Sequence, residues 1–131
     1  MNALLAPEPL IFVDLETSGA NFANDRIIEI GLIEVDQSGT REWSVLVNPE
    51  RPLSPFITGL TGIDDAMLDS APPFREVAPA LLDRLRGRLF IAHNARFDYG
   101  FLKSEFRRLG MDFRAPNLCT VKLSRKLFPQ H

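Results

Sequence analysis

Two carboxylates stand at the end of a short apolar run near the start of the chain. Asp14 and Glu16 follow Leu10–Val13 in the segment FVDLETSG. If that run is a buried strand, side chains two residues apart point to the same side, so the two acids emerge together. Two poorly hydrated carboxylates repel each other, and a cation between them removes that cost. Their hard oxygen atoms suit Mg²⁺ or Mn²⁺, although one acid could equally cap the following loop while the other is solvated.

A third carboxylate, Asp98, follows a second apolar run. Leu89–Ala92 leads into a polar turn, and Asp98 falls in the first turn of the next expected helix. A helix start favours a carboxylate by about 0.3–1 kcal/mol, so Asp98 taken alone is explained by its position. If the two apolar runs are neighbouring strands, however, three acids converge at one place, and capping does not explain three. The sequence therefore predicts a divalent-metal site made by Asp14, Glu16 and Asp98.

Four segments are predicted to be strands. Leu10–Val13 and Leu89–Ala92 are wholly apolar, as expected for strands buried on both faces, whereas Arg26–Val35 alternates apolar and polar residues. Glu42–Val47 follows a hairpin-type turn at residues 36–39. The first three strands with their short connections predict an antiparallel meander. The fourth is expected beside the first and parallel to it, so that their carboxyl ends form a crevice for a ligand.

Helical spacing of apolar residues predicts helices over Phe74–Arg86, Arg96–Leu109 and Thr120–Phe128. The proline- and glycine-rich stretch at residues 52–73 is expected to be a loop with one short helical turn. Strands followed by alternating helix, strand and helix give an α/β order, and the length fits one domain.

Composition excludes several classes of protein. No apolar run approaches the length of a membrane span, the first residues lack the pattern of a secretory signal, and the single cysteine, Cys119, cannot form an internal disulfide. A cytoplasmic protein is expected. Residues 1–70 contain 12 acids and 3 Lys/Arg, and residues 71–131 contain 5 acids and 12 Lys/Arg. This uneven distribution of charge suits a metal site beside a track for a polyanion. It is explained equally simply if each half of the chain has its own solvated, charged surface.

Three segments together carry a family resemblance. FVDLETSG (residues 12–19), ITGLTGIDDAML (57–68) and IAHNARFDYGFL (91–102) resemble the first two motifs and the intervening loop of the DnaQ-like exonucleases. This group of the DEDD superfamily includes the proofreading epsilon subunit of bacterial DNA polymerase III. The resemblance covers residues 10–129. It implies a ribonuclease-H-like fold, in which a mixed sheet of an antiparallel meander plus parallel strands has flanking helices. It also implies 3′–5′ hydrolysis of DNA ends with release of nucleoside 5′-monophosphates.

The resemblance also implies roles for particular residues. Asp14, Glu16 and Asp98 would be the catalytic residues and the ligands of two Mg²⁺ or Mn²⁺ ions. Residues that would contact the substrate are Leu15, Thr17, Leu60, Thr61, His93 and Asn94. Each of these has a simpler alternative: Leu60 could be a core residue, Thr17 a turn former, and His93 a hydrogen-bonded histidine at a strand end.

The family completes its site with a third motif, a His or Tyr followed by an Asp, and we identify none in residues 1–131. By resemblance to the branch with His, the DEDDh exonucleases, the domain at 1–131 is expected to be truncated at its C-terminus and inactive or weakly active alone. Its expected partners are single-stranded or frayed DNA 3′ ends and a DNA polymerase or fused second domain, in proofreading or repair. An RNA-trimming exonuclease and a non-catalytic nucleic-acid-binding module remain as alternatives.

Overall fold

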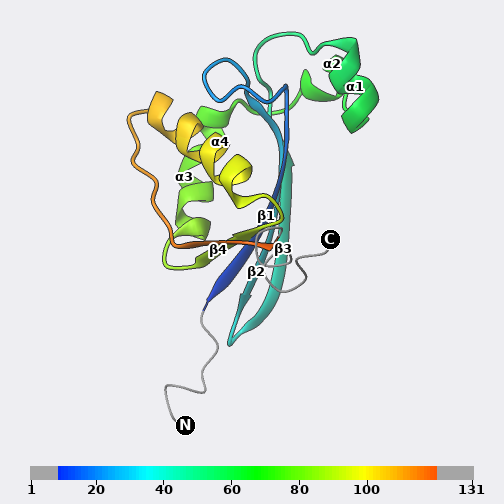
Figure 1. Ribbon diagram of the computed structural model, residues 1–131. Helices are drawn as coiled ribbons and strands as arrows, with labels where there is room; N and C mark the ends of the chain where they lie inside the picture. The colour runs from blue at the N-terminus through cyan, green and yellow to red at the C-terminus, as the bar shows by residue number, and fades with distance from the viewer. Residues whose placement is uncertain (1–8, 121–131) are drawn as a thin grey trace, which may run out of the picture.

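The structure is a computed structural model that describes residues 9–120 (Figure 1). The helix expected at Thr120–Phe128 lies outside the described residues apart from its first one. Among the described residues, none of the helices has the length and hydropathy needed to cross a membrane.

A mixed sheet, with five strands in the described part of the chain, forms the centre of the molecule. Its strands are β1 (Leu10–Thr17), β2 (Ile27–Asp36), β3 (Gly39–Leu46), β4 (Leu89–Ala92) and β5 (Asn117–Cys119), in the spatial order β3-β2-β1-β4-β5. The first three strands pair antiparallel, and β4 runs parallel to β1, so both expectations for these strands are confirmed. The short strand β5, which pairs parallel with β4, has no counterpart in the sequence-based prediction.

Within residues 9–120, four helices accompany the sheet: α1 (Pro55–Thr61), α2 (Asp65–Leu68), α3 (Phe74–Leu85) and α4 (Ala95–Arg108). The expected single turn in the loop is thus two short helices. Local signals explain α1: the Ser54 side chain caps the N–H of Ile57, Pro55 occupies the first turn, and Gly62 ends the helix with a φ of 77°.

The main core lies between one face of the sheet and the helices α3 and α4, which lie on the same side of it (Figure 1). From β1, the buried side chains Ile11, Val13 and Leu15 point into this core. Because side chains alternate along a strand, Asp14 and Glu16 point to the opposite, open face. The strand is longer than the apolar run predicts, and both acids are therefore held in regular strand backbone.

A β-bulge marks the end of β1. Glu16 pairs with Glu29 and Thr17 pairs with Ile27, so Ile28 is the extra residue. The Ile28 side chain is fully buried, but in a second, smaller apolar cluster. The other buried members of that cluster are Ile57, Ile63 and Leu68. The bulge therefore seats α1 and α2 beside the end of the strand that carries the two acids.

Candidate metal centre and its two walls

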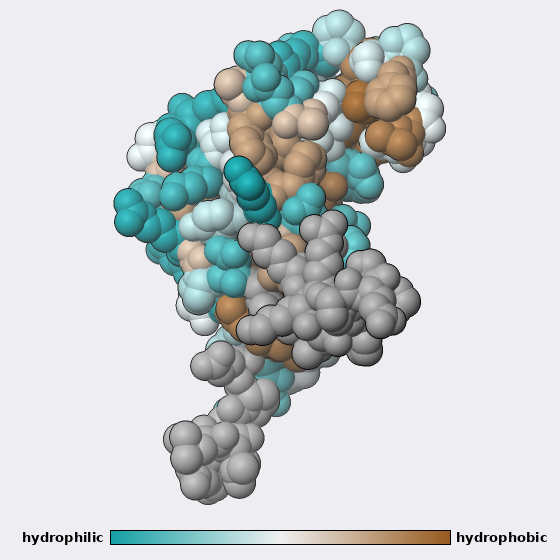
Figure 2. Space-filling model, in the orientation of Figure 1, coloured by the Kyte–Doolittle hydropathy of each residue, from teal (hydrophilic) through white to brown (hydrophobic). Residues whose placement is uncertain are grey.

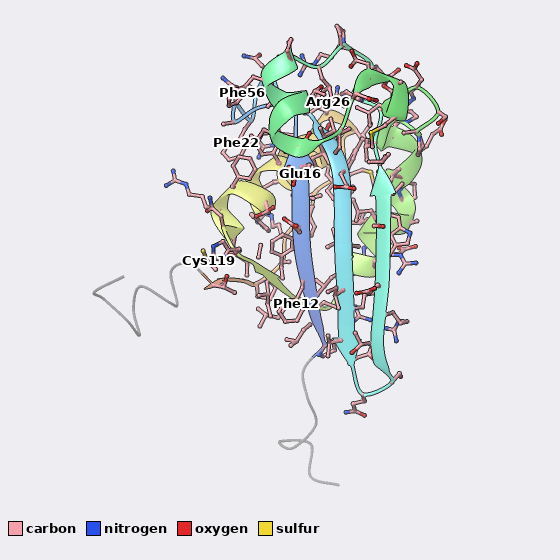
Figure 3. All side chains as sticks on the ribbon, turned by 90° about the vertical axis from the view of Figure 1, so that its right-hand side faces the viewer. Phe12, Glu16, Phe22, Arg26, Phe56 and Cys119 are labelled. Carbon is pink, nitrogen blue, oxygen red and sulfur yellow. The ribbon has the colours of Figure 1, made fainter. Side chains whose placement is uncertain are left out.

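Asp14 and Glu16 lie on the open face of the sheet toward the carboxyl end of β1. Figure 3 shows Glu16 above Phe12 on this strand. A hollow of about 540 Å³ runs along the open face, and Asp14 and His93 are among its lining residues. The strand therefore does what the spacing predicts: it presents both carboxylates on one side.

Asp98 reaches the same region from the first turn of α4. Its side chain is 7% exposed, and the backbone N–H of Leu15 lies close enough to its carboxylate to affect its pKa. Burial raises the pKa of Asp98 to about 6, and the negative charge of Asp14 acts in the same direction. The N–H of Leu15 opposes that rise. The backbone of Leu15, a residue expected to contact substrate, thus also favours the charged form of Asp98.

Glu16 shares this electrostatic environment. Burial raises its pKa, and the charges of Asp14 and Glu29 raise it further. Glu29 stands directly across from Glu16 on β2, and the sequence analysis did not single it out. Its only signal was its polar position within the alternating segment IIEIG.

The three acids fit a hard divalent cation by the chemistry of their donors. Carboxylate oxygens are the ligands Mg²⁺ and Mn²⁺ prefer, and a cation would offset the burial and the repulsion that together raise the pKa values of Glu16 and Asp98. Within residues 9–120, however, no group of three or more His, Cys, Asp or Glu side chains is gathered in a metal-ligand arrangement. The side chains lie in one electrostatic environment without forming a closed ligand cluster.

Two of the residues expected to contact substrate flank the turn into α4. The exposed His93 places Nδ1 2.9 Å from the hydroxyl of Thr120. Asn94 precedes the helix, and its carbonyl accepts the N–H groups of Phe97 and Asp98. The backbone of Asn94 therefore fixes the turn that carries the third carboxylate, and its exposed side chain makes no capping bond.

The remaining residues expected to contact substrate differ in their burial and in their hydrogen bonds. Thr17 is buried and donates to the carbonyl of Gly19 at 2.6 Å, which is the hydrogen bond of a turn former. Thr61 donates to the carbonyl of Ile57 at 2.8 Å. Leu60 is 70% exposed, so it is not a core residue.

One wall of the candidate site consists of α4 and the loop Ser18–Arg26, and we call it the α4 wall. Glu105, only 1% exposed, ties the two together. One of its carboxylate oxygens accepts from Arg26 at 2.8 Å and from Arg108 at 3.1 Å, and the other accepts the backbone N–H of Ile27 at 3.0 Å. Because Ile27 pairs with Thr17, this buried carboxylate fixes the strand end next to Glu16.

The tip of the same loop is also fastened to α4. The Phe22 ring packs edge-on against Phe101, with ring centroids 4.9 Å apart. Its carbonyl accepts hydrogen bonds from Ser104 and Arg108. Gly100 makes this contact possible, because a Cβ there would lie 2.6 Å from the Phe22 ring.

The opposite wall is formed by residues 55–68, and we call it the α1–α2 wall. Its buried side chains belong to the small cluster around Ile28 and not to the main core. Asp64 caps α2, and Asp65 accepts the N–H of Leu53 at 2.9 Å. Outside this cluster the wall exposes large apolar side chains, visible in Figure 2 as brown atoms over α1 and α2.

Comparison with known proteins identifies the family. A profile of the family described as Exonuclease matches residues 11–131. DNA polymerase III PolC-type of Caldanaerobacter subterraneus subsp. tengcongensis is 42% identical over 127 residues, in a match that covers 96% of this chain and 9% of that protein. DNA polymerase III subunit epsilon of Haemophilus influenzae is 34% identical over 137 residues, covering 96% of this chain and 54% of that protein. The chain therefore spans only a part of these relatives.

Solved structures agree with this assignment. Exonuclease I, crystallised with SSB and an inhibitor, superimposes with a TM-score of 0.83 at 18% identity, covering 92% of this chain and 30% of that one. This likeness shows the fold, which is ribonuclease-H-like as expected. Exonuclease X in complex with 5′ overhanging duplex DNA has a TM-score of 0.68 at 31% identity, covering 92% and 64% of the two chains. The resemblance to the epsilon subunit is thus confirmed, and the chain belongs to the exonuclease family.

Proposed function

We propose that this chain is a metal-dependent 3′–5′ exonuclease module that hydrolyses the terminal phosphodiester bond of DNA and releases nucleoside 5′-monophosphates. What supports the proposal is that Asp14, Glu16 and Asp98 lie near one another at the carboxyl end of β1, close enough for the charge of Asp14 to raise the pKa values of the other two carboxyl groups. The relatives named as DNA polymerase III proteins support DNA as the substrate and replication or repair as the setting. The module would act there as part of a larger protein or beside a polymerase.

Each carboxylate has a distinct part in the proposal. Asp14 and Glu16 would hold two Mg²⁺ or Mn²⁺ ions from the open face, and Asp98 would complete the set from α4. When bound, such ions activate a water molecule and stabilise the leaving 3′-oxygen. The backbone N–H groups of Leu15 and Asp98 lower the pKa of the Asp98 carboxyl and so favour its charged form, which is the form that binds a cation.

The exposed side chain of Leu60 would contact the base of the terminal nucleotide. Since Leu60 is 70% exposed, its truncation should barely alter stability. We expect Leu60→Ala to weaken binding of thymidine 5′-monophosphate, measured by calorimetry, while leaving the melting temperature within about 2 °C of the wild-type value. An unchanged nucleotide affinity would remove Leu60 from the site.

A single-turnover nuclease assay tests the function itself. The substrates are 3′-labelled single-stranded DNA, the equivalent RNA and a circular single-stranded DNA without ends, each with Mg²⁺ and an excess of protein. Turnover should be slow, because we assign no general base in residues 1–131 and such a base typically contributes about 10²–10⁴-fold.

We expect the labelled mononucleotide to be the first product from linear DNA, the circle to stay intact, and Asp14→Asn to abolish release. Asp83→Asn, a change of the same charge at a 78% exposed side chain, should retain it. Cleavage of the circle, a longer first product, or activity in Asp14→Asn would contradict the proposal. Faster release from RNA would change the substrate class to RNA.

A further inference from the structure

The two walls of the candidate site differ in charge. Of the twelve described lysines and arginines, eight form ion pairs with carboxylates. Three of the other four, Arg96, Lys103 and Arg107, lie on α4. They are spaced at seven and four residues, which places them on one side of the helix over a length of about 16 Å. These side chains, which pair with no carboxylate of the described chain, lie on the side of α4 opposite Asp98, because separations of two, five and nine residues correspond to rotations of about 200°, 140° and 180°.

The α1–α2 wall and its flanks have the opposite character. Residues 50–69 contain four carboxylates and one arginine. The same segment exposes three large apolar side chains: Phe56 at 74%, Leu60 at 70% and Met67 at 43%. An acidic, apolar surface repels a phosphate but accepts an uncharged aromatic ring.

Phe56 is the most exposed large apolar residue of the described chain. It precedes Leu60 by four residues on α1, so the two side chains share one side of the helix. The helix itself is seated on Ile28, the bulge residue next to Glu16. Figure 3 shows Phe56 at the end of the molecule where β1 carries Glu16. The exposed ring of Phe56 therefore extends the apolar surface that Leu60 begins, away from the carboxylates on β1.

We propose that Phe56 stacks on the nucleobase next to the terminal nucleotide, with the bases of the strand toward the α1–α2 wall. The inference rests on the proposed function and extends it from one nucleotide to two. Aromatic stacking tolerates any base, because every base has a π-face. Phe56 would thus strengthen binding to single-stranded ends without sequence preference.

Fluorescence anisotropy and calorimetry on the whole chain test this with Ca²⁺ in the buffer. The ligands are thymidine 5′-monophosphate, a short oligothymidylate, and the same oligonucleotide with an abasic second position from the 3′ end. Phe56→Ala should weaken binding of the intact oligonucleotide about tenfold and leave the affinities for the mononucleotide and the abasic strand unchanged. Phe56→Trp should restore binding, and Phe56→Leu, which is apolar without a ring, should not.

Leu109→Ala removes another exposed apolar side chain, 38% exposed at the far end of α4, and should bind all three ligands normally. Equal binding of the intact oligonucleotide by wild type and Phe56→Ala would overturn this inference alone. An equal loss on the abasic strand would overturn it as well. Failure of the wild type to bind either the mononucleotide or the oligonucleotide would overturn both the inference and the proposed function.

Discussion

The α4 wall and the α1–α2 wall of the candidate site are held in place by different means. The α4 wall is tied to the main core and to β2 by a buried carboxylate, Glu105, and by an aromatic contact at Phe22. The α1–α2 wall rests on a small cluster around Ile28 and exposes Phe56 and Leu60. The firmly held wall carries a proposed metal ligand, whereas the lightly held wall carries the proposed base contacts. Chemistry that depends on position is thus placed on the part with less freedom to move.

The largest difference between the walls should appear when the buried carboxylate is removed. Glu105→Ala leaves Arg26, Arg108 and the N–H of Ile27 without their acceptor. We expect a loss of about 3 kcal/mol in the free energy of unfolding, at the low end for a broken buried pair because both arginines are partly exposed. Urea unfolding measures it. Glu50→Ala, which breaks the exposed pair with Arg75, is the matched control and should cost less than about 1 kcal/mol. If both variants lose the same free energy of unfolding, Glu105 contributes no more to stability than an exposed ion pair does.

Hydrogen exchange should separate the walls without any mutation. Opening α1 exposes only the small cluster, so its amides need little of the global unfolding free energy to exchange. We expect the amides of Thr58 and Gly62 to exchange at least about 100-fold faster than those of Phe101–Phe106 in α4, after correction for intrinsic rates. Bound oligonucleotide should protect α1. Similar protection of both helices in the free protein would refute the comparison.

Two glycines offer the finest contrast, since the same substitution should have opposite signs in the two walls. Gly59 lies in α1 with open space around the position of a Cβ, so Gly59→Ala should stabilise by about 0.5 kcal/mol through reduced entropy of the unfolded chain. At Gly100 the added Cβ meets the Phe22 ring, and Gly100→Ala should destabilise by about 1 kcal/mol from overpacking. Thermal unfolding of both variants decides. If both substitutions change the melting temperature in the same direction, the loop that carries Phe22 moves aside at little cost in free energy, and the contrast between the walls is wrong.

Sequence reasoning succeeded where one local pattern decides the structure. The buried run before Asp14 and the run at Leu89–Ala92 predicted parallel neighbouring strands, and the spacing of Asp14 and Glu16 predicted their common side. These results follow from apolar composition and from the period of a strand.

The contacts that hold the two walls in place could not be predicted from any local sequence pattern. Glu105 and Arg26 are 79 residues apart, and each alone is an ordinary surface-type residue in the sequence. The strand β5 has three residues and is defined only by its pairing with β4. The bulge at Ile28 arises from the register of β1 against β2, which neither strand specifies by itself.

Binding of Mn²⁺, measured by isothermal titration calorimetry, tests the central claim most directly, because it needs no turnover. The account predicts that the wild type binds Mn²⁺ and that Asp14→Asn combined with Asp98→Asn weakens binding by more than about tenfold. Asp83→Asn combined with Asp112→Asn makes the same change in net charge at exposed positions and should leave the affinity unchanged. If the Asp14→Asn and Asp98→Asn double variant binds Mn²⁺ as the wild type does, the three carboxylates are not the metal centre.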